Sequence, residues 1–380
     1  MKARWFVNDD IPTNILTRLS AKTLHYLKYV SKEWYNLIST RSFIRLQLKT
    51  KEPLSGFFFQ EIFQWADVDD MESISYIPVE IKTLNVFRTV LNFLPEPIVI
   101  LSSDNGLLCC RSCLPSTEPK LYICNPLNKQ YITLLWPNLS RNCSVGLVFD
   151  PFQNLDKSTD FKLVSVSDIE VGDDDFCFVF DIYSSKTGLW RRSNERCQCN
   201  HSLIKNKGVS AGGILYWLTD GHQILMFDPQ NELSWLVETP LPSTEMNSVP
   251  EMCIGECENK LNYVIICEDG LQLWALEDHF SNMWCLKFFL SLEELEKANS
   301  DFLYDIKEKV ARRYCRDALA WLDPLAFKDW MLFLRVSGNV YLYEFESGRM
   351  KKLCDVSTLG PKSMFSPIVV PYAMSLFPLG

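Results

Sequence analysis

The sequence predicts a small all-α segment over residues 1–50, followed by an all-β propeller over residues 51–380. Charge divides the chain near this boundary: residues 1–51 contain ten Lys or Arg and three Asp or Glu, whereas the remainder contains 28 and 44. The hydrophobic pattern changes at the same place, from helical spacing to short apolar runs separated by turn residues. At 380 residues, 47% of them hydrophobic, the chain is long enough to fold both units.

The first segment carries its apolar side chains at the spacing of an amphipathic helix. From Leu27 to Ile38 the steps between them are three, four, three and one. Ser31 is suited to cap a helix N-terminus, so two short helices meeting near Val30 and one long helix are both open. A segment this short cannot bury its large apolar side chains alone. It therefore needs a partner surface, or it serves as a helical cap on the following domain.

A loose repeat in the second segment predicts propeller blades. Each copy has a strand, a turn, and an aromatic residue that begins the outer strand. The copies are YICNPLNKQY (122–131), FDIYSSKTGLW (180–190), MFDPQNELSW (226–235) and WALEDHFSNMW (274–284), anchored at Asn125, Tyr183, Asp228 and Glu277. Asx side chains cap such turns, and a period near 45–50 residues is typical of kelch-like blades. We expect six blades; seven blades or an incomplete ring stay open.

Two segments outside this repeat have predicted roles. Residues 368–374 are expected to form a strand that pairs with residues 57–60 and closes the ring, because an unpaired first blade would expose a sheet edge. Residues 291–313 break the period. Ser291 and Glu294 match a capping box, and the charged sequence after them predicts a helical insertion.

Two patterns in the sequence could bind a metal ion, but each is incomplete. Cys197, Cys199 and His201 could supply three zinc ligands, but a structural zinc site needs a fourth. The acidic run at residues 173–175 lacks the ligand and Gly pattern of a calcium loop. We therefore expect no metal, no cofactor and no catalytic residue. A propeller glycoside hydrolase that uses paired carboxylates in the central channel is the less favoured enzyme alternative.

Composition also restricts the compartment and the partners. Fourteen cysteines without a visible signal peptide predict reduced thiols in a cytoplasmic and/or nuclear protein. The basic helical segment has no nucleic-acid-binding motif, so no nucleic acid is expected. The uncharged run over residues 363–380 is interrupted by Pro367, Pro371 and Pro378, which predicts a strand and a tail rather than a membrane span.

Five motifs occur in order near the start of the chain: IPTNIL (11–16), RLSAKTL (18–24), VSKEW (30–34), LIS (37–39) and SFIRLQL (42–48). In this order they resemble the F-box of plant-type F-box proteins, a three-helix domain. The motifs SSDNGLLC (102–109) and LAFKDWMLFLRVSGNVYLYEFESGRM (325–350), together with the repeat copies, resemble the F-box-associated β-propeller that follows it in that family.

This resemblance implies a non-catalytic substrate-recognition subunit of an SCF-type (Skp-cullin-F-box) E3 ubiquitin ligase. The F-box would bind a Skp-family adaptor and, through it, a cullin-RING scaffold, while propeller loops would bind an unknown target protein. The residues that match the family's adaptor contacts are Ile11, Pro12, Ile15, Leu16, Leu19, Leu24, Leu27, Val30 and Trp34. The first helix is about one turn, about 5.4 Å, shorter than is usual in the family. The alternative is therefore a propeller interaction protein with a degenerate F-box that acts outside ubiquitination.

Overall fold

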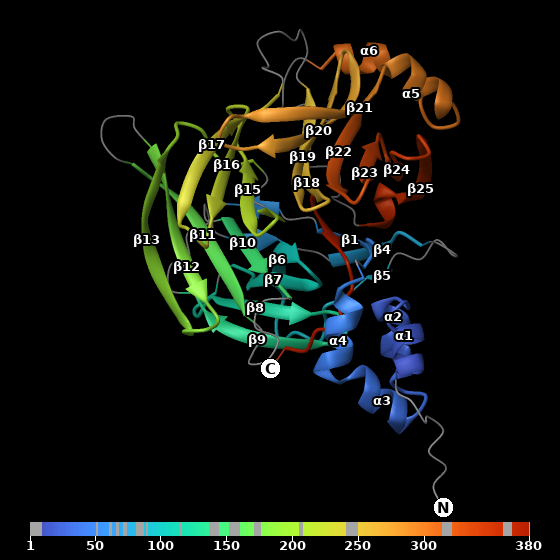
Figure 1. Cartoon of the computed structure of the whole chain (residues 1–380). Coiled ribbons are helices and arrows are strands. Elements are labelled where there is room, and N and C mark those ends of the chain that lie inside the picture. The colour runs from blue at the N-terminus through green and yellow to red at the C-terminus, as the bar shows by residue number, and fades with distance from the viewer. Residues whose placement is uncertain are drawn as a thin grey trace, which may run out of the picture.

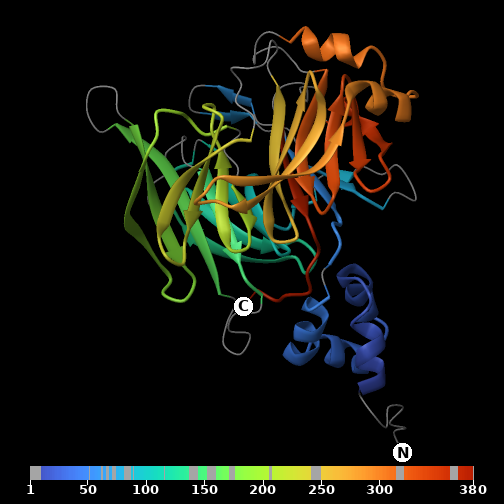
Figure 2. The same ribbon diagram turned by 45° about the horizontal axis from the view of Figure 1, so that its top comes forward.

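The structure is a computed structural model of the chain. It describes residues 10–50, 52–60, 63–65, 68–70, 74–80, 87–88, 90–114, 116–136, 144–151, 160–170, 176–204, 208–240, 250–313, 321–359 and 367–379. Short helices come first, and most of the remainder is β-sheet arranged in a ring, with the helices at one side of it (Figures 1 and 2). Within these ranges no helix is both long and apolar enough to cross a membrane.

The N-terminal helices are short, and hydroxyl caps separate them. They are α1 (Asp10–Leu16), α2 (Ala21–Leu27), α3 (Lys32–Ile38) and α4 (Arg41–Leu48). The side chains of Ser20, Ser31 and Thr40 each accept a hydrogen bond from the backbone amide three residues later, at 3.2–3.3 Å. The cap at Ser31 shows that two short helices, not one long helix, meet near Val30. The cap at Thr40 starts a further helix, so the expected three-helix unit has four helices in this structure.

Four separate four-stranded sheets form blades of a β-propeller, each with antiparallel neighbours. In sheet order, their strands are β26 (Ile368–Tyr372), β1 (Gly56–Gln60), β4 (Ile74–Pro78) and β5 (Phe87–Arg88); β6 (Ile98–Asp104), β7 (Leu107–Ser112), β8 (Lys120–Asn125) and β9 (Gln130–Leu135); β10 (Ser144–Phe149), β11 (Phe161–Glu170), β12 (Phe176–Ser184) and β13 (Leu189–Gln198); β14 (Val209–Ala211), β15 (Ile214–Leu218), β16 (Gln223–Asp228) and β17 (Leu233–Glu238). A short hairpin, β2 (Phe63–Trp65) and β3 (Val68–Asp70), stands apart from these blades.

The remaining strands form one eight-stranded sheet that consists of two antiparallel meanders. The first contains β18 (Glu251–Cys257), β19 (Lys260–Cys267), β20 (Gly270–Asp278) and β21 (Met283–Leu290); the second contains β22 (Leu322–Lys328), β23 (Met331–Val336), β24 (Asn339–Glu344) and β25 (Arg349–Asp355), followed by the 3-10 helix η2 (Val356–Thr358). Only two parallel residue pairs, Gly255 with Phe327 and Glu256 with Lys328, join the meanders. The count of six blades stays a prediction.

The predicted closure of the ring is confirmed. Strand β26 pairs antiparallel with β1, from Gly56 opposite Tyr372 to Gln60 opposite Ile368. The two ends of the colour scale therefore lie side by side in one blade (Figure 1). The side chain of Gln60 extends the connection, because its Oε1 accepts a hydrogen bond from the amide of Ile100 at 2.7 Å, in the next blade.

Asx side chains cap two of the predicted turns. The Oδ1 of Asn125 accepts from the amide of Leu127 at 3.0 Å, and the Oδ1 of Asp228 accepts from the amide of Gln230 at 2.7 Å. Each bond satisfies a backbone donor that the turn would otherwise leave unpaired. This confirms the turn chemistry predicted for these copies of the repeat.

The anchor predicted at Glu277 is wrong by one residue. The equivalent turn bond is made by Asp278, whose Oδ1 accepts from the amide of Phe280 at 2.9 Å. A register shift between β20 and β21 at this point moves the turn along the chain by one residue. Glu277 instead forms ion pairs with Lys260 and with Lys287.

The aromatic residues of the repeat lie near the starts of outer strands, and two of them join neighbouring blades. The indole Nε1 of Trp190 in β13 donates to the carbonyl oxygen of Leu135, the last residue of β9, at 3.1 Å. The indole Nε1 of Trp284 in β21 donates to the carbonyl oxygen of Glu238, the last residue of β17, at 2.9 Å. The repeat therefore carries a blade-to-blade hydrogen bond as well as a turn.

The predicted helical insertion is present as α5 (Leu292–Ala298) and α6 (Ile306–Ala311). The capping box is formed: the Oγ of Ser291 accepts from the amide of Glu294, whose carboxylate accepts from the amide of Ser291. One face of the insertion joins a core with the eight-stranded sheet. Its buried residues in this core are Leu292, Leu295, Leu303 and Ile306.

Candidate functional site

The four N-terminal helices are packed against the propeller. Their buried side chains belong to the same hydrophobic core as strands β6–β11 and the tail that follows β26. Both views show the helices beside the C-terminal tail at one side of the ring (Figures 1 and 2). The helical members of this core are Leu16, Ala21, Leu24, Ile38, Phe43 and Ile44, and the tail members are Leu376, Phe377 and Leu379.

Polar contacts fix the orientation of α2. The Glu52 carboxylate accepts hydrogen bonds from the amide of Ala21 and from the Nε2 of Gln47, at 2.9 Å in the second case. Burial raises the pKa of Glu52, and these two bonds lower it. Burial, followed by the charge of Lys28, lowers the pKa of the His25 imidazole, and the nearby Asn128 side chain of the propeller raises it. These contacts anchor both ends of α2.

The turn between β8 and β9 holds the C-terminal tail and the helices together. The buried Nδ2 of Asn125 donates to the carbonyl oxygens of Ser375 at 2.9 Å and Phe377 at 2.8 Å. Asn128 donates to the carbonyl oxygen of Phe377 at 3.1 Å and also contacts His25. This turn is therefore the link between the propeller, the tail and α2.

The structure separates the nine predicted adaptor contacts by burial. Leu16 and Leu24 are 3% and 0% exposed, so they hold the helices on the propeller. Ile15 and Val30 are 61% and 67% exposed, so their apolar side chains lie at the surface. Half-buried positions are occupied by Pro12, Leu19, Leu27 and Trp34. Ile11 lies in α1, and its side chain is outside the described residues. Adaptor contact by any of the nine stays a prediction.

Sequence reasoning missed a set of exposed aromatic side chains on α2, on α3 and in the turn between them. Tyr26, Tyr29 and Tyr35 are 62%, 78% and 55% exposed. The first two have their rings near that of His25, with centroids 6.2 and 5.6 Å away. The signal was the spacing of three residues between Tyr26 and Tyr29, but amphiphilic tyrosines were not counted with the apolar face. Together with Ile15 and Val30 they form what we call the exposed apolar set.

The three candidate zinc ligands do not form a metal site within the described residues. Burial raises the pKa of the Cys197 thiol to about 11 and also raises that of Cys199. His201 is instead 3.4 Å from the Asp220 carboxylate, and no three His, Cys, Asp or Glu side chains in the described ranges are placed to hold a metal ion. Residues 173–175 lie outside those ranges. Among the propeller carboxylates, the Oε2 of Glu256 lies 2.6 Å from the Nζ of Lys328.

Comparisons with known proteins agree with this architecture. The family model described as "F-box protein At3g26010-like, beta-propeller" matches residues 83–300, and the F-box domain model matches residues 9–46. Two Arabidopsis thaliana relatives are similar along most of the chain. F-box protein At5g07610 is 26% identical, with coverage of 92% of this chain and 86% of the relative. F-box protein At5g49610 is also 26% identical, with coverage of 92% and 91%.

Solved structures give a weaker likeness. TolB from Acinetobacter baumannii is 11% identical, with a TM-score of 0.41 and coverage of 87% of this chain and 70% of TolB. This score is too low to support an argument about function.

Proposed function

The chain belongs to the F-box proteins with an At3g26010-like β-propeller, and from this we propose that it is the substrate-recognition subunit of an SCF-type E3 ubiquitin ligase. Its helices would bind a Skp-family adaptor, which connects to a cullin-RING scaffold, and the propeller would bind a target protein. The chain itself supplies no catalytic residue in this proposal. It accelerates transfer of ubiquitin by proximity, because tethering makes the encounter effectively intramolecular.

The exposed apolar set carries this proposal. The buried side of the helices already has its partner, because Leu16 and Leu24 lie in a core shared with the propeller. Ile15 and Val30 lie outside that core and are mostly exposed, as are the three tyrosines of the same N-terminal unit. Apolar and aromatic side chains gathered on one small unit are typical of a protein interaction site.

The structure decides which substitutions test adaptor binding. Leu24→Ala or Trp34→Ala would disturb packing against the core, so loss of binding would be ambiguous. Ile15→Asp and Val30→Asp alter exposed side chains and should leave the fold intact. We expect a Skp-family adaptor to co-purify with the wild-type chain and not with the double variant that carries both Ile15→Asp and Val30→Asp. Leu189→Asp is the matched control, because Leu189 is 69% exposed on the outer strand β13.

The remaining outcomes separate the two readings of the F-box. If the wild-type chain binds no adaptor but binds after insertion of four residues behind Thr13, the shortened α1 has lost adaptor binding and the non-ligase alternative holds. Co-purification that survives in the folded double variant would show that the exposed apolar set is not the adaptor surface.

We further propose that the ring has six blades. In support, each half of the eight-stranded sheet has the four-strand meander order of the separate blades, and only two residue pairs join the halves. Counting the halves separately gives six. A crystal structure of the purified chain would test this count, and a continuous twisted eight-stranded sheet would contradict it.

A cytoplasmic and/or nuclear location is part of the proposal. The described cysteines are all free thiols and most are buried, which suits a reducing compartment. A fluorescent fusion of the full chain would test this location, and accumulation in the secretory pathway would contradict it.

A further inference from the structure

A cavity of about 610 Å³ is lined by residues from several blades of the propeller. Part of its wall consists of residues in or just after strands of several blades: Asp104 and Asn105 at β6, Phe149 and Asp150 at β10, Ser210 and Gly212 at β14, Glu256 and Asn259 at β18, and Lys328 at the end of β22. The outer wall comes from the β12–β13 and β16–β17 turns. The cavity therefore lies where the blades converge, and its volume suits a short peptide segment.

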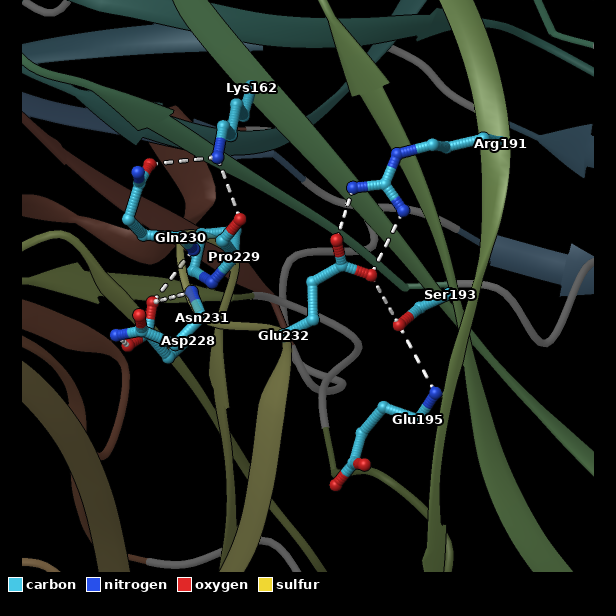
Figure 3. A network of polar contacts seen from close by, with 9 residues as sticks. All are labelled: Lys162, Arg191, Ser193, Glu195, Asp228, Pro229, Gln230, Asn231 and Glu232. Carbon is cyan, nitrogen blue, oxygen red and sulfur yellow. Dashed lines mark hydrogen bonds and ion pairs between the residues drawn. The ribbon is translucent and has the colours of Figure 1, made fainter.

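The cavity wall is acidic, and its lysines are already engaged. The described residues that line it include five carboxylate side chains and three lysines. The Nζ of Lys328 is 2.6 Å from the Glu256 carboxylate, and that of Lys186 is 3.3 Å from Asp160. The Nζ of Lys162 donates to the carbonyl oxygen of Pro229 at 2.7 Å and to the Oε1 of Gln230 at 3.0 Å (Figure 3). Each lysine is thus held by a group of the wall.

Two of the carboxylates bind only neutral donors in the part of the chain that the structure describes. The Oδ2 of Asp104 accepts from the amide of Phe149 at 2.9 Å and from the hydroxyl of Ser210 at 3.1 Å. Asp228 accepts from the amides of Gln230 and Asn231 and from the Asn231 side chain, and caps the turn drawn in Figure 3. These hydrogen bonds hold the carboxylates in place without neutralising their charge.

Asp104 is half-buried in the cavity wall. Burial raises the pKa of its carboxyl group to about 6; the amide of Phe149, Lys328 and Ser210 lower it, and Glu256 raises it slightly. An ionised carboxylate in such a site is poorly solvated, so a cation placed beside it gains more than it would at an exposed carboxylate. The cavity therefore favours a positively charged ligand over a neutral or negative one.

We propose that this cavity binds a basic segment of the target protein and that a lysine or arginine side chain of that segment reaches Asp104. The proposal rests on the proposed function, since it names the target class of the same substrate receptor. The charge of the propeller supports it as well: residues 52–380 hold 44 acidic and 28 basic residues. A field of this sign attracts basic partners and repels acidic ones.

The test is binding of labelled peptides to the purified full chain, followed by fluorescence anisotropy. The probe is a peptide with three arginines separated by Gly and Ser, and the comparison peptides carry glutamate or phosphoserine in place of arginine. Asp104→Asn keeps an acceptor for Phe149 and Ser210 but removes the charge. We expect this variant to bind the arginine peptide about tenfold or more weakly. Glu346→Gln, on the exposed β24–β25 turn outside the cavity, removes the same charge and should bind as the wild type does.

Other results would overturn the inference. Equal binding of the glutamate or phosphoserine peptide, unchanged affinity in the folded Asp104→Asn variant, or equal weakening by Glu346→Gln would each do so. Adaptor co-purification is measured on the same preparations. If the adaptor binds and the arginine peptide does not, the cavity assignment is wrong while the proposed function stands. If the peptide binds and the adaptor does not, the proposed function is wrong and the cavity assignment stands for a propeller that acts outside ubiquitination.

Discussion

The indole Nε1 of Trp284 lies 2.9 Å from the carbonyl oxygen of Glu238, and this hydrogen bond joins the outer strands of two neighbouring blades. The same relationship joins Trp190 and Leu135 one pair of blades earlier. Both tryptophans occupy the aromatic position of the sequence repeat. At these two junctions the aromatic position of the repeat thus supplies a hydrogen bond between the outer strands of neighbouring blades.

Trp284→Phe removes this bond and keeps a smaller aromatic ring at the same position. We expect the free energy of unfolding to fall by about 1 kcal/mol, because one hydrogen bond is lost and the Glu238 carbonyl returns to water. Urea denaturation measures the change. Trp235→Phe is the control, since Trp235 occupies the same repeat position and is 44% exposed. Equal effects of the two substitutions would show that ring size, and not the hydrogen bond, determines the stability.

Val369→Asp should prevent the ring from closing. Val369 is 0% exposed in β26 opposite Phe59, so the variant would bury a carboxylate without a partner. We expect a loss of about 3–5 kcal/mol or more, seen as a lower unfolding midpoint or little soluble protein. Val30→Asp makes the same chemical change at a residue that is 67% exposed, and its unfolding midpoint should stay at the wild-type value. A stable, soluble Val369→Asp protein would contradict a structural role for β26.

Asn125→Asp should release the C-terminal tail while keeping the turn. The carboxylate can still cap the turn at Leu127, but it cannot donate to the carbonyl oxygens of Ser375 and Phe377. Loss of these buried bonds should cost about 1–3 kcal/mol. Limited proteolysis would detect the change as faster cleavage within residues 373–379. Because the tail shares a core with α1–α4, looser helices should accompany it, and an unchanged cleavage pattern would argue against this coupling.

We expect Asp104 to contribute to the free energy of unfolding at low pH, and this contribution should fall as pH rises from about 4 to about 6. Its pKa is 3.8 in the reference state and about 6 in the folded protein, so the folded state holds more protons in this window. Lys328 and Ser210 oppose this shift and Glu256 adds to it. Denaturant titrations at several pH values would measure this contribution as a difference between wild type and Asp104→Asn. Parallel curves for the two proteins would show that Asp104 titrates normally.

Local sequence rules predicted much of the fold. The cap at Ser31, the capping box at Ser291, the Asx turn at Asp228 and the pairing of β26 with β1 each depend on a residue type whose chemistry acts within a few positions or at a sheet edge. The anchor at Glu277 failed because a strand irregularity shifts the register by one residue, and spacing alone cannot show a bulge.

The candidate site was harder to predict, for a physical reason. A helical apolar face marks Leu24 and Val30 alike, yet one is fully buried against the propeller and the other is mostly exposed. Periodicity shows that a side chain needs an apolar neighbour, but not whether that neighbour belongs to the same chain. The cavity around Asp104 was invisible in the sequence because its wall is assembled from turns of several blades.

The pairing of β26 with β1 also determines how late in synthesis the propeller can complete its folding. Residues 56–60 leave the ribosome long before residues 368–372, so the first blade is incomplete until residue 372 has been translated. The core beneath α1–α4 also forms late, because Leu376, Phe377 and Leu379 contribute to it. A chain that stops short of these residues would present its F-box helices without their support. The helices can therefore pack in their final position only after residues 376–379 have been translated.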